Sequence, residues 1–352
     1  MIIFNKILPA VTHDVGIDLG TTNTIVSVKG YGIVVSEPSV VAIRKNTKRI
    51  LAVGEEARRM IGRTPASIIA VKPLKDGVIS DFDSTEAMIR YFIQRVYDEY
   101  PKIFKIKRPR IVIGIPSSIT EVEARAVIDA ATSAGARKVY IIEEPMAAAI
   151  GAGLAIDDAS GSMIVDIGGG TTDIAVISLG GIVVDNTIRI AGNEIDDEIL
   201  NFVKNKYNFQ IGLKFAEDVK IAIGSVKPIK KEREVEVKGR DLLTGLPKII
   251  TLSSIEVREA MLKVIDKIID AIKEALEQTP PEILSDLLEK GITLSGGGAL
   301  IEGLDRYMED KLQTPVIIAD DPLTCVVRGT SILLDEIDLL ERLQLSDQDL
   351  TL

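Results

Sequence analysis

The chain has 352 residues, of which 46% are hydrophobic and 27% charged, and this length and composition predict a folded protein with two or more domains. Its formal net charge of −10 argues against a general nucleic-acid surface, because such a surface needs basic side chains to displace counterions. The single cysteine, Cys325, excludes a disulfide framework and suits a reducing cytoplasm, and its apolar surroundings predict a buried side chain rather than a nucleophile. The single histidine, His13, has no partner pattern for zinc or triad chemistry. No stretch reaches about 18 uncharged apolar residues, so the sequence predicts no membrane span.

The first half of the chain alternates between strand and helix patterns. Strands are expected over 15–20, 24–30 and 33–43, and residues 44–76 are richer in charged and turn residues and predict a small excursion. Apolar residues at helical spacing predict a helix over 84–100, followed by a strand over 110–116 and a helix over 117–136. Thr120 and Glu123 predict a capping box for that helix and Gly135 its end. A strand over 138–142 then leads to a helix over 143–153 with Pro145 in its first turn.

The second half begins with a hairpin over 162–181 and adds its own insertion. Helices are expected over 192–208 and 214–226, a β-hairpin over 232–253, and a long helix over 254–278. The chain then continues with a short helix over 280–290, a strand over 291–296 and a glycine cluster that opens another helix. Its tail starts helical and ends acidic.

The stretches "VGIDLGTTNTIVSVKG" and "SMIVDIGGGTTDIAVISLGG" share one pattern, an Asp at the end of a strand, a Gly-Thr turn and a second apolar strand. A tight turn rich in glycine presents backbone N–H groups to phosphate oxygens. The aspartates repel phosphate, so they make sense with a cation between, and hard carboxylate oxygens suit Mg²⁺ through water. The repetition predicts an internal duplication whose two hairpins hold one polyphosphate. We assign Asp18, Gly20, Thr21, Thr22 and Asn23 to one side and Asp166, Gly168, Gly169, Gly170, Thr171 and Thr172 to the other, with Asp18 and Asp166 as the metal residues.

Two further patterns fit a nucleoside. The cluster Gly296, Gly297, Gly298 and Ala299 lacks bulky side chains, so a flat base can lie against it. Glu217 and Lys220 stand three apart on one predicted helical face, where a carboxylate can accept from ribose hydroxyls and a lysine stem can cover the base. Taken alone, this last pair is an ordinary surface pairing. The chain contains no P-loop, and the second hairpin does not fit the dinucleotide-binding fingerprint, because it opens a strand and not a helix.

These motifs resemble a known superfamily. "IDLGTTNT", "VDIGGGTTD" and "LSGGGAL" are similar to the phosphate-1, phosphate-2 and adenosine signatures of the actin, heat-shock-chaperone and sugar-kinase ATPases. "EPSVVAI", "GRTPASI", "KPLKDGVISDF", "IEEPMAAAIGAGL", "AVISLGGIV" and "DPLTCVVRGT" resemble more narrowly the MreB family of bacterial actins, and the likeness runs from about residue 14 to about residue 336.

The resemblance implies an α/β fold of the two-lobed actin type, a duplicated core with two smaller inserted subdomains. Subdomain IA would hold residues 1–41, 77–158 and 329–352, subdomain IB 42–76, subdomain IIA 159–194 and 260–328, and subdomain IIB 195–259. It also implies an ATPase that binds ATP and Mg²⁺ in the cleft, adds Gly192 to the nucleotide site, and forms cytoskeletal filaments that govern cell shape. Hydrolysis to ADP and phosphate would be slow and coupled to the polymer.

By the family pattern, Glu144 is the acid that positions the attacking water, a role that suits a carboxylate at a strand end before a helix. The alternative explanation for Glu144 is that its negative charge compensates the positive end of the helix dipole. Thr171 or Thr172 would hold the same water, and we favour Thr171. The sequence departs from the family pattern at Asn193 and Ala222, which removes possible contacts near the nucleotide and bears on affinity and base preference, and Thr22 is a milder change within the phosphate loop.

The resemblance also implies a partner surface. Family members bind membranes through an exposed apolar loop, and "YPKIFKIKRPR" offers Ile103 and Phe104 among basic residues that suit an anionic bilayer. The apolar start "MIIFNKIL" is a second candidate anchor, or simply a lead-in to the first strand. The expected location is the cytoplasm, at the inner face of the cell membrane, with other copies of the chain, related family copies or membrane morphogenesis proteins as partners and no nucleic acid.

Three other functions remain open from the residues. A chaperone-type ATPase shares every phosphate motif, but it would need a further substrate-binding domain. A metabolic kinase would need an acceptor site, and the sequence has no sugar-like acceptor signature. A scaffold that binds ATP without cleaving it is harder to exclude, because Glu144 is necessary for hydrolysis but not sufficient.

Overall fold

The computed structural model describes residues 14–75, 77–99, 108–117 and 119–343. The chain forms two compact units. Of the described residues, unit 1 holds those up to 158 together with 179–182 and 323–343, and unit 2 holds 159–178 and 183–322. Across the described ranges, no helix combines the length and the apolar character that a membrane span needs.

Unit 1 is built on a five-stranded sheet with the strand order β10-β9-β1-β2-β3. Strand β1 pairs antiparallel with β2 and parallel with β9, which pairs parallel with β10. The elements of this sheet and its helices are β1 (Val15–Leu19), β2 (Asn23–Val28), β3 (Gly32–Pro38), α3 (Phe82–Glu99), β9 (Arg110–Ile115), α4 (Glu121–Ser133), β10 (Lys138–Glu143), α5 (Glu144–Gly151), α11 (Cys325–Asp335) and α12 (Ile337–Leu343). The predicted capping box of α4 is confirmed, because the Thr120 side chain accepts from the Glu123 N–H and the Glu123 side chain accepts from the Thr120 N–H.

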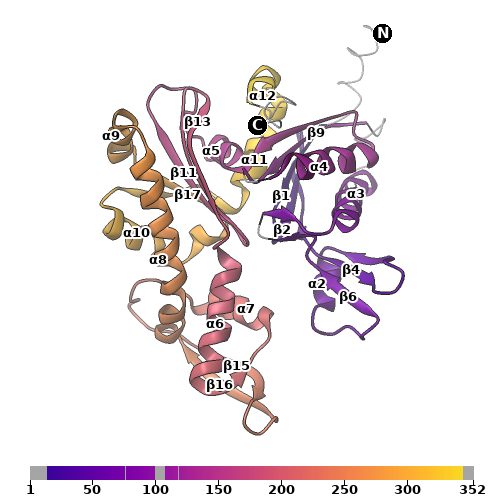
Figure 1. Ribbon diagram of the computed structural model, residues 1–352, viewed down its shortest axis with the longest axis vertical. Coiled ribbons are helices and arrows are strands. Elements are labelled where there is room, and N and C mark those ends of the chain that lie inside the picture. The colour runs from indigo at the N-terminus through magenta and orange to yellow at the C-terminus, as the bar shows by residue number, and fades with distance from the viewer. Residues whose placement is uncertain (1–13, 76, 100–107, 118, 344–352) are drawn as a thin grey trace. The chain divides into compact units, whose positions relative to one another are not determined.

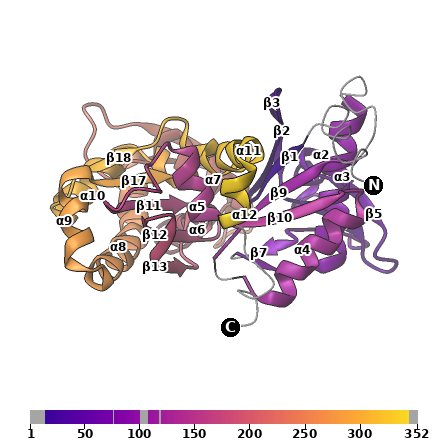
Figure 2. The ribbon, with the colours of Figure 1, turned by 90° about the horizontal axis from the view of Figure 1, so that it is seen from above.

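Side chains alternate between the two faces of this sheet, as the period of a strand requires. On one face, Val15 and the alternate residues of β1 and β9 join the core that α3 and α4 complete. On the other face, glycines let α11 approach closely: a Cβ on Gly16 would lie 2.6 Å from Thr330 Oγ1, and one on Gly114 would lie 2.8 Å from Val326 Cγ1. Helices α3 and α4 therefore cover one face and α11 the other (Figure 2).

Residues 41–71 form a separate three-stranded sheet in the order β5-β4-β6, together with one short helix. Its elements are β4 (Val41–Arg44), β5 (Ile50–Val53), α2 (Glu55–Met60) and β6 (Ile68–Val71), and the small pair β7 (Leu74–Lys75) and β8 (Val78–Ile79) follows. The predicted single strand over 33–43 is wrong, because the chain leaves the large sheet after Pro38 and enters another sheet at Val41. Proline marks a strand end because it has no N–H for the ladder, and Ser39 bonds to the β1–β2 turn instead.

Unit 2 repeats the same sheet, with the order β13-β12-β11-β17-β18. Strand β11 pairs antiparallel with β12 and parallel with β17, which pairs parallel with β18. The elements of unit 2 are β11 (Ser162–Ile167), β12 (Thr172–Ser178), β13 (Gly181–Ile188), α6 (Gly192–Tyr207), β14 (Phe209–Gln210), α7 (Leu213–Ile223), β15 (Glu234–Asp241), β16 (Pro247–Ser253), α8 (Ser254–Gln278), α9 (Pro281–Lys290), β17 (Ile292–Ser295), η2 (Gly297–Leu300), α10 (Leu304–Leu312) and β18 (Val316–Ile318), with η3 (Pro322–Thr324) before α11. The predicted duplication is confirmed, because each sheet places its third, second, first, fourth and fifth strands in that order.

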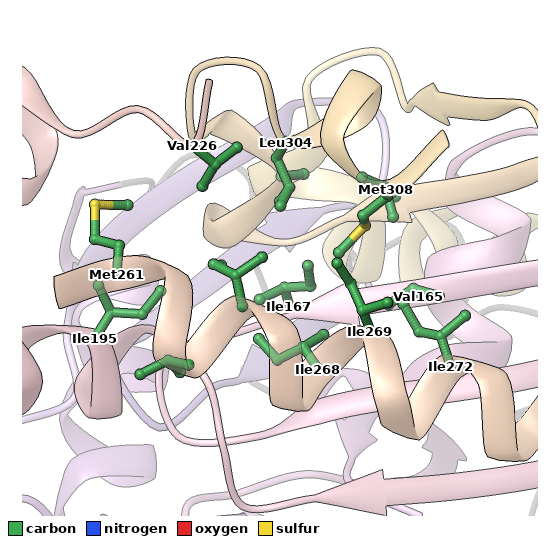
Figure 3. Packing of buried hydrophobic residues seen from close by; sticks show 14 of the residues in the cluster. Val165, Ile167, Ile195, Val226, Met261, Ile268, Ile269, Ile272, Leu304 and Met308 are labelled. Atoms are coloured by element: carbon green, nitrogen blue, oxygen red, sulfur yellow. The ribbon is translucent and has the colours of Figure 1, made fainter. Parts of the chain in front are cut away.

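The core of unit 2 forms around α8, whose apolar residues recur at helical spacing. Ile268, Ile269 and Ile272 lie in one cluster with Val165 and Ile167 of β11 (Figure 3). Figure 1 shows α8 running from the β15–β16 hairpin to the five-stranded sheet. One long helix thus follows the inserted hairpin and packs against the strand that carries Asp166.

The predicted helix directly after the glycine cluster is wrong. The chain makes a single 3-10 turn over Gly297–Leu300, and α10 begins only at Leu304. Gly296 and Gly303 have φ angles of +77° and +81°, which a right-handed helix cannot contain. The prediction for Cys325, in contrast, is confirmed, because its side chain is fully buried at the start of α11.

Candidate nucleotide-binding site

The turn between β1 and β2 carries the first predicted phosphate loop, residues 20–23. A Cβ on Gly20 would lie 2.7 Å from the Asn23 carbonyl oxygen, so the turn needs glycine here. Thr21 is buried, and the Thr22 hydroxyl is buried without a hydrogen-bond partner among the residues that the structure describes. Buried hydroxyls are rarely left unbonded, so the Thr22 hydroxyl suits a ligand oxygen or a water held in the loop.

Asp18 and Glu144 lie at the carboxyl ends of β1 and β10, the two strands that flank β9 in unit 1. Asp18 stands opposite Gly114 in the β1–β9 register, and a Cβ on Gly114 would lie 3.6 Å from Glu144 Cγ. Glu144 is buried and is the first residue of α5, directly after β10. The structure therefore places the predicted metal residue and the predicted water-positioning residue next to Gly114 of β9, at the edge of the sheet where α/β proteins bind ligands.

The second predicted phosphate loop, residues 168–171, joins β11 to β12 in unit 2. The Gly168 N–H donates to the Thr171 carbonyl at 2.9 Å and closes the turn. The carbonyls of Gly168 and Gly169 accept from the N–H groups of Gly192 at 3.2 Å and Asn193 at 2.7 Å. Because Asn193 holds the loop through its backbone, this contact does not depend on the side chain in which the sequence departs from the family pattern.

Lys220 connects α7 to the start of α6. Its Nζ lies 2.9 Å from the Gly192 carbonyl oxygen and 2.9 Å from Asp196 Oδ1. Asp196 is buried, and Lys220 is mostly buried, so the ion pair is held away from solvent. Glu217 lies half-buried three residues before Lys220 on the same helix. Lys220 thus fixes the position of Gly192, which the resemblance places in the nucleotide site.

The buried carboxylate of Asp166 has two close neighbours. Ser295 Oγ of β17 donates to Asp166 Oδ1 at 2.9 Å, and Asp173 stands directly opposite Asp166 in the β11–β12 register. Burial raises the pKa of Asp166 to about 6, although the Ser295 bond lowers it. Burial also raises the pKa of Asp173 to about 7, with the bond from Thr187 opposing and the charge of Asp166 adding to the shift.

These shifts predict a pH dependence of stability in the protein free of nucleotide and metal. A carboxyl group whose pKa is raised on folding binds its proton more tightly when folded, so its contribution is fully present below about pH 4 and is lost as the pH rises through about 6 to 7. We expect Asp173→Asn, which keeps the acceptor for Thr187, to gain free energy of unfolding relative to the wild-type protein as the pH rises from 4 to 8. Urea unfolding across this range measures it, and a difference that does not change with pH would contradict the prediction.

The glycine cluster of residues 296–299 lies against the end of β11. A Cβ on Gly296 would lie 2.5 Å from Asp166 Oδ1, and one on Gly298 would lie 2.2 Å from Ile167 Cγ2. Ala299 is fully buried, and Gly297 is exposed. The glycine cluster therefore packs against Asp166 and Ile167 at the end of β11, where only glycine fits at positions 296 and 298.

Comparison with known proteins assigns the chain to a family. The sequence model of the MreB/Mbl protein family matches residues 12–342. The chain belongs to the MreB/Mbl family. It is 50% identical over 334 residues to the cell shape-determining protein Mbl of Bacillus subtilis, covering 95% of this chain and 99% of Mbl. It is 49% identical over 332 residues to the cell shape-determining protein MreB of Escherichia coli, covering 93% and 95%.

The fold agrees with a solved structure of an MreB/Mbl relative. The crystal structure of MreB5 of Spiroplasma citri bound to ADP superposes with a TM-score of 0.88 at 42% identity, covering 94% of this chain and 98% of MreB5. MreB5 has also been crystallised with AMPPNP. The actin-like fold implied by the sequence motifs is therefore confirmed, and the chain is a member of a cytoskeletal family whose curated relatives determine cell shape.

Some residues that build this MreB/Mbl site were missed in the sequence. Asp173 closes the motif "VDIGGGTTD", and Ser295 begins the glycine cluster, so both stood within recognised motifs. Asp196 had no such signal, because its partner Lys220 is on another helix. The predicted membrane residues Ile103 and Phe104 and the segment 1–8 lie outside the described residues. Within the described ranges, no three acidic, histidine or cysteine side chains lie close enough together to hold a metal without further ligands.

Proposed function

We propose that the chain is an ATP-dependent polymerising bacterial actin whose membrane-associated filaments govern cell shape. The chain would bind ATP and Mg²⁺, and ATP would be hydrolysed with filament assembly. The observation that carries the proposal is the duplicated hairpin: in each copy, an aspartate lies near the end of the first strand, and a Gly-Thr loop joins this strand to the second. The nucleotide complexes of the relative MreB5 support the same ligand class.

The residues present fit a nucleotide with a divalent cation. The Thr22 hydroxyl and the glycine turns suit phosphate oxygens. Asp18 and Asp166 would hold Mg²⁺, which neutralises phosphate charge when bound. Ser295 orients the Asp166 carboxylate, and Glu144 together with Thr171 would orient the attacking water.

The β15–β16 hairpin offers a surface for self-association. Leu242, Leu243, Leu246 and Ile249 gather at its turn and are 41%, 80%, 64% and 53% exposed. Four large apolar side chains on one hairpin tip form a patch that monomers rarely leave uncovered. In a polymerising protein, a second copy of the chain would cover this tip.

The start of β1 and the start of β9 support the proposed membrane contact. Asp14 accepts from the Arg110 N–H at 2.9 Å and is ion-paired with the Arg110 guanidinium, and Arg137 lies 3.5 Å from the same carboxylate. Val15 stands opposite Ile111 in the parallel register. Asp14 and Arg110, which border or belong to the two candidate membrane segments 1–8 and 100–110 in the sequence, therefore lie at the same end of the sheet of unit 1.

The first test is phosphate release from ATP as a function of protein concentration. Turnover per molecule is expected to rise above a threshold concentration, because neighbours in a filament complete the active conformation. Leu243→Asp at the hairpin tip is expected to raise this threshold by at least about fivefold, the effect of losing one important interface side chain. Val122→Asp is the matched control, because Val122 is 79% exposed on α4 and should leave the threshold unchanged.

Each result separates the proposal from its alternatives. Constant turnover on dilution would contradict polymer coupling, and ATP binding without turnover would indicate a scaffold. In the same samples, assembled protein should sediment with vesicles of anionic phosphatidylglycerol and not with neutral phosphatidylcholine. Sedimentation with both kinds of vesicle, or with neither, would contradict the proposed electrostatic contact with the membrane.

A further inference from the structure

Ser39 lies between β3 and β4, outside every residue so far assigned to the site. It is fully buried. The end of β3 pairs with the start of β2, with Pro38 opposite Asn23 and Glu37 opposite Thr24. Ser39 therefore stands directly behind the first phosphate loop.

Ser39 makes two hydrogen bonds to carbonyls of that loop. Its Oγ donates to the Gly20 carbonyl at 2.6 Å, and its N–H donates to the Thr22 carbonyl at 2.9 Å. The Thr24 hydroxyl lies 2.9 Å from Ser39 Oγ. A serine hydroxyl has one proton, which goes to Gly20, so Thr24 donates to Ser39.

These bonds orient the loop. In a trans peptide unit the C=O and N–H bonds point in opposite directions. Because Ser39 holds the Gly20 carbonyl toward the protein interior, the N–H of Thr21 is turned to the opposite side. A phosphate loop works by presenting such N–H groups in a fixed direction.

Glu37 anchors this arrangement from the same strand. Its carboxylate forms an ion pair with Arg95 of α3 and accepts from the Glu55 N–H of α2 at 3.3 Å. Gly54 allows this approach, because a Cβ there would lie 1.8 Å from Glu37 Oε2. The end of β3 is thus fixed to α2 and α3 two residues before Ser39.

We propose that Ser39 is a positioning residue for the first phosphate loop and that Glu37 acts through it, so that the loop depends on how β3 is held by α2 and α3. The inference rests on the proposed nucleotide-binding function. The competing explanation is that Ser39 only satisfies buried polar groups at a strand end. The two explanations differ in what happens to the phosphate part of the ligand.

The test compares ADP and adenosine binding to the full chain by calorimetry. Ser39→Ala is expected to weaken ADP binding by about fivefold to tenfold, the effect of one net hydrogen bond, and to leave adenosine binding unchanged. Ser27→Ala is the matched control, because Ser27 is also buried and its Oγ donates to a β1 carbonyl, that of Gly16, at 3.5 Å. It should lower the unfolding midpoint comparably without changing ADP affinity.

Two further variants complete the test. Thr24→Val keeps the Ser39–Gly20 bond and should weaken ADP binding less than Ser39→Ala does. If Ser39→Ala does not fold, Thr24→Val tests the proposal in its place, and the absence of an ADP-specific loss in Thr24→Val would then overturn the proposal. Glu37→Gln should weaken ADP binding in the wild-type background and have no further effect in Ser39→Ala, as expected for residues acting in series. Wild-type protein that binds no ADP would overturn the nucleotide function itself, whereas equal ADP losses in Ser39→Ala and Ser27→Ala would overturn only this inference.

Discussion

Glu144→Gln is expected to reduce phosphate release at least about a hundredfold while ADP and ATP still bind, because a positioned acid or base of this kind contributes two or more orders of magnitude to the rate. The substitution keeps the size of the side chain at the buried start of α5, so the packing around Gly114 is preserved. What it removes is the negative charge that would orient and polarise the attacking water. Single-turnover phosphate release at saturating ATP measures the effect on the chemical step.

The neighbouring acid provides the control for that prediction. Glu143 ends β10 and precedes α5, so Glu143→Gln changes the charge by the same amount one residue away. We expect it to retain most of the wild-type rate. A comparable loss in both variants would indicate that charge at the helix N-terminus, and not a positioned carboxylate, is what matters; loss of ATP binding in Glu144→Gln would also contradict the assigned role.

Gly296→Ala is expected to lower ADP affinity at least about tenfold and to destabilise unit 2 by about 3 kcal/mol. A side chain at a φ of +77° and a ψ of 173°, a region essentially restricted to glycine, costs about 1–3 kcal/mol by itself. The new Cβ would also lie 2.4 Å from the Ile167 carbonyl oxygen and 2.5 Å from Asp166 Oδ1. Since one of these atoms belongs to backbone, relief requires moving the end of β11, and with it the second phosphate loop.

Gly303→Ala separates the two causes of that loss. Gly303 has a φ of +81°, but the nearest atom to an added Cβ is Lys227 Cβ at 3.4 Å. It should therefore show only the conformational cost, about 1 kcal/mol, with unchanged ADP affinity. Urea unfolding and ADP titration of both variants give the comparison, and equal behaviour of the two would mean that close contact with Asp166 has no part in the effect.

The turns on which the candidate site is built could be predicted from short motifs. The two Asp-Gly-Thr hairpins, the glycine cluster and the capping box at Thr120 are encoded within a few residues, so local patterns were sufficient to find them. The predictions failed where a distant contact competes with a local pattern. Apolar alternation over 33–43 continues past Pro38, but Ser39 bonds to Gly20, 19 residues earlier, and the strand ends there.

By itself, the sequence determined most of the long strands and helices, the duplication and the family, and it predicted the two phosphate loops, because each is set by periodicity or by motifs of fewer than about a dozen residues. Only the tertiary structure decided which side chains meet around them. Asp166 and Ser295 are 129 residues apart and come together through the parallel register of β11 and β17. Lys220 finds Asp196 because α6 and α7 pack together, and Ser39 reaches the phosphate loop because β3 lies beside β2. Such contacts depend on how whole elements pair, and no short stretch of chain carries that information.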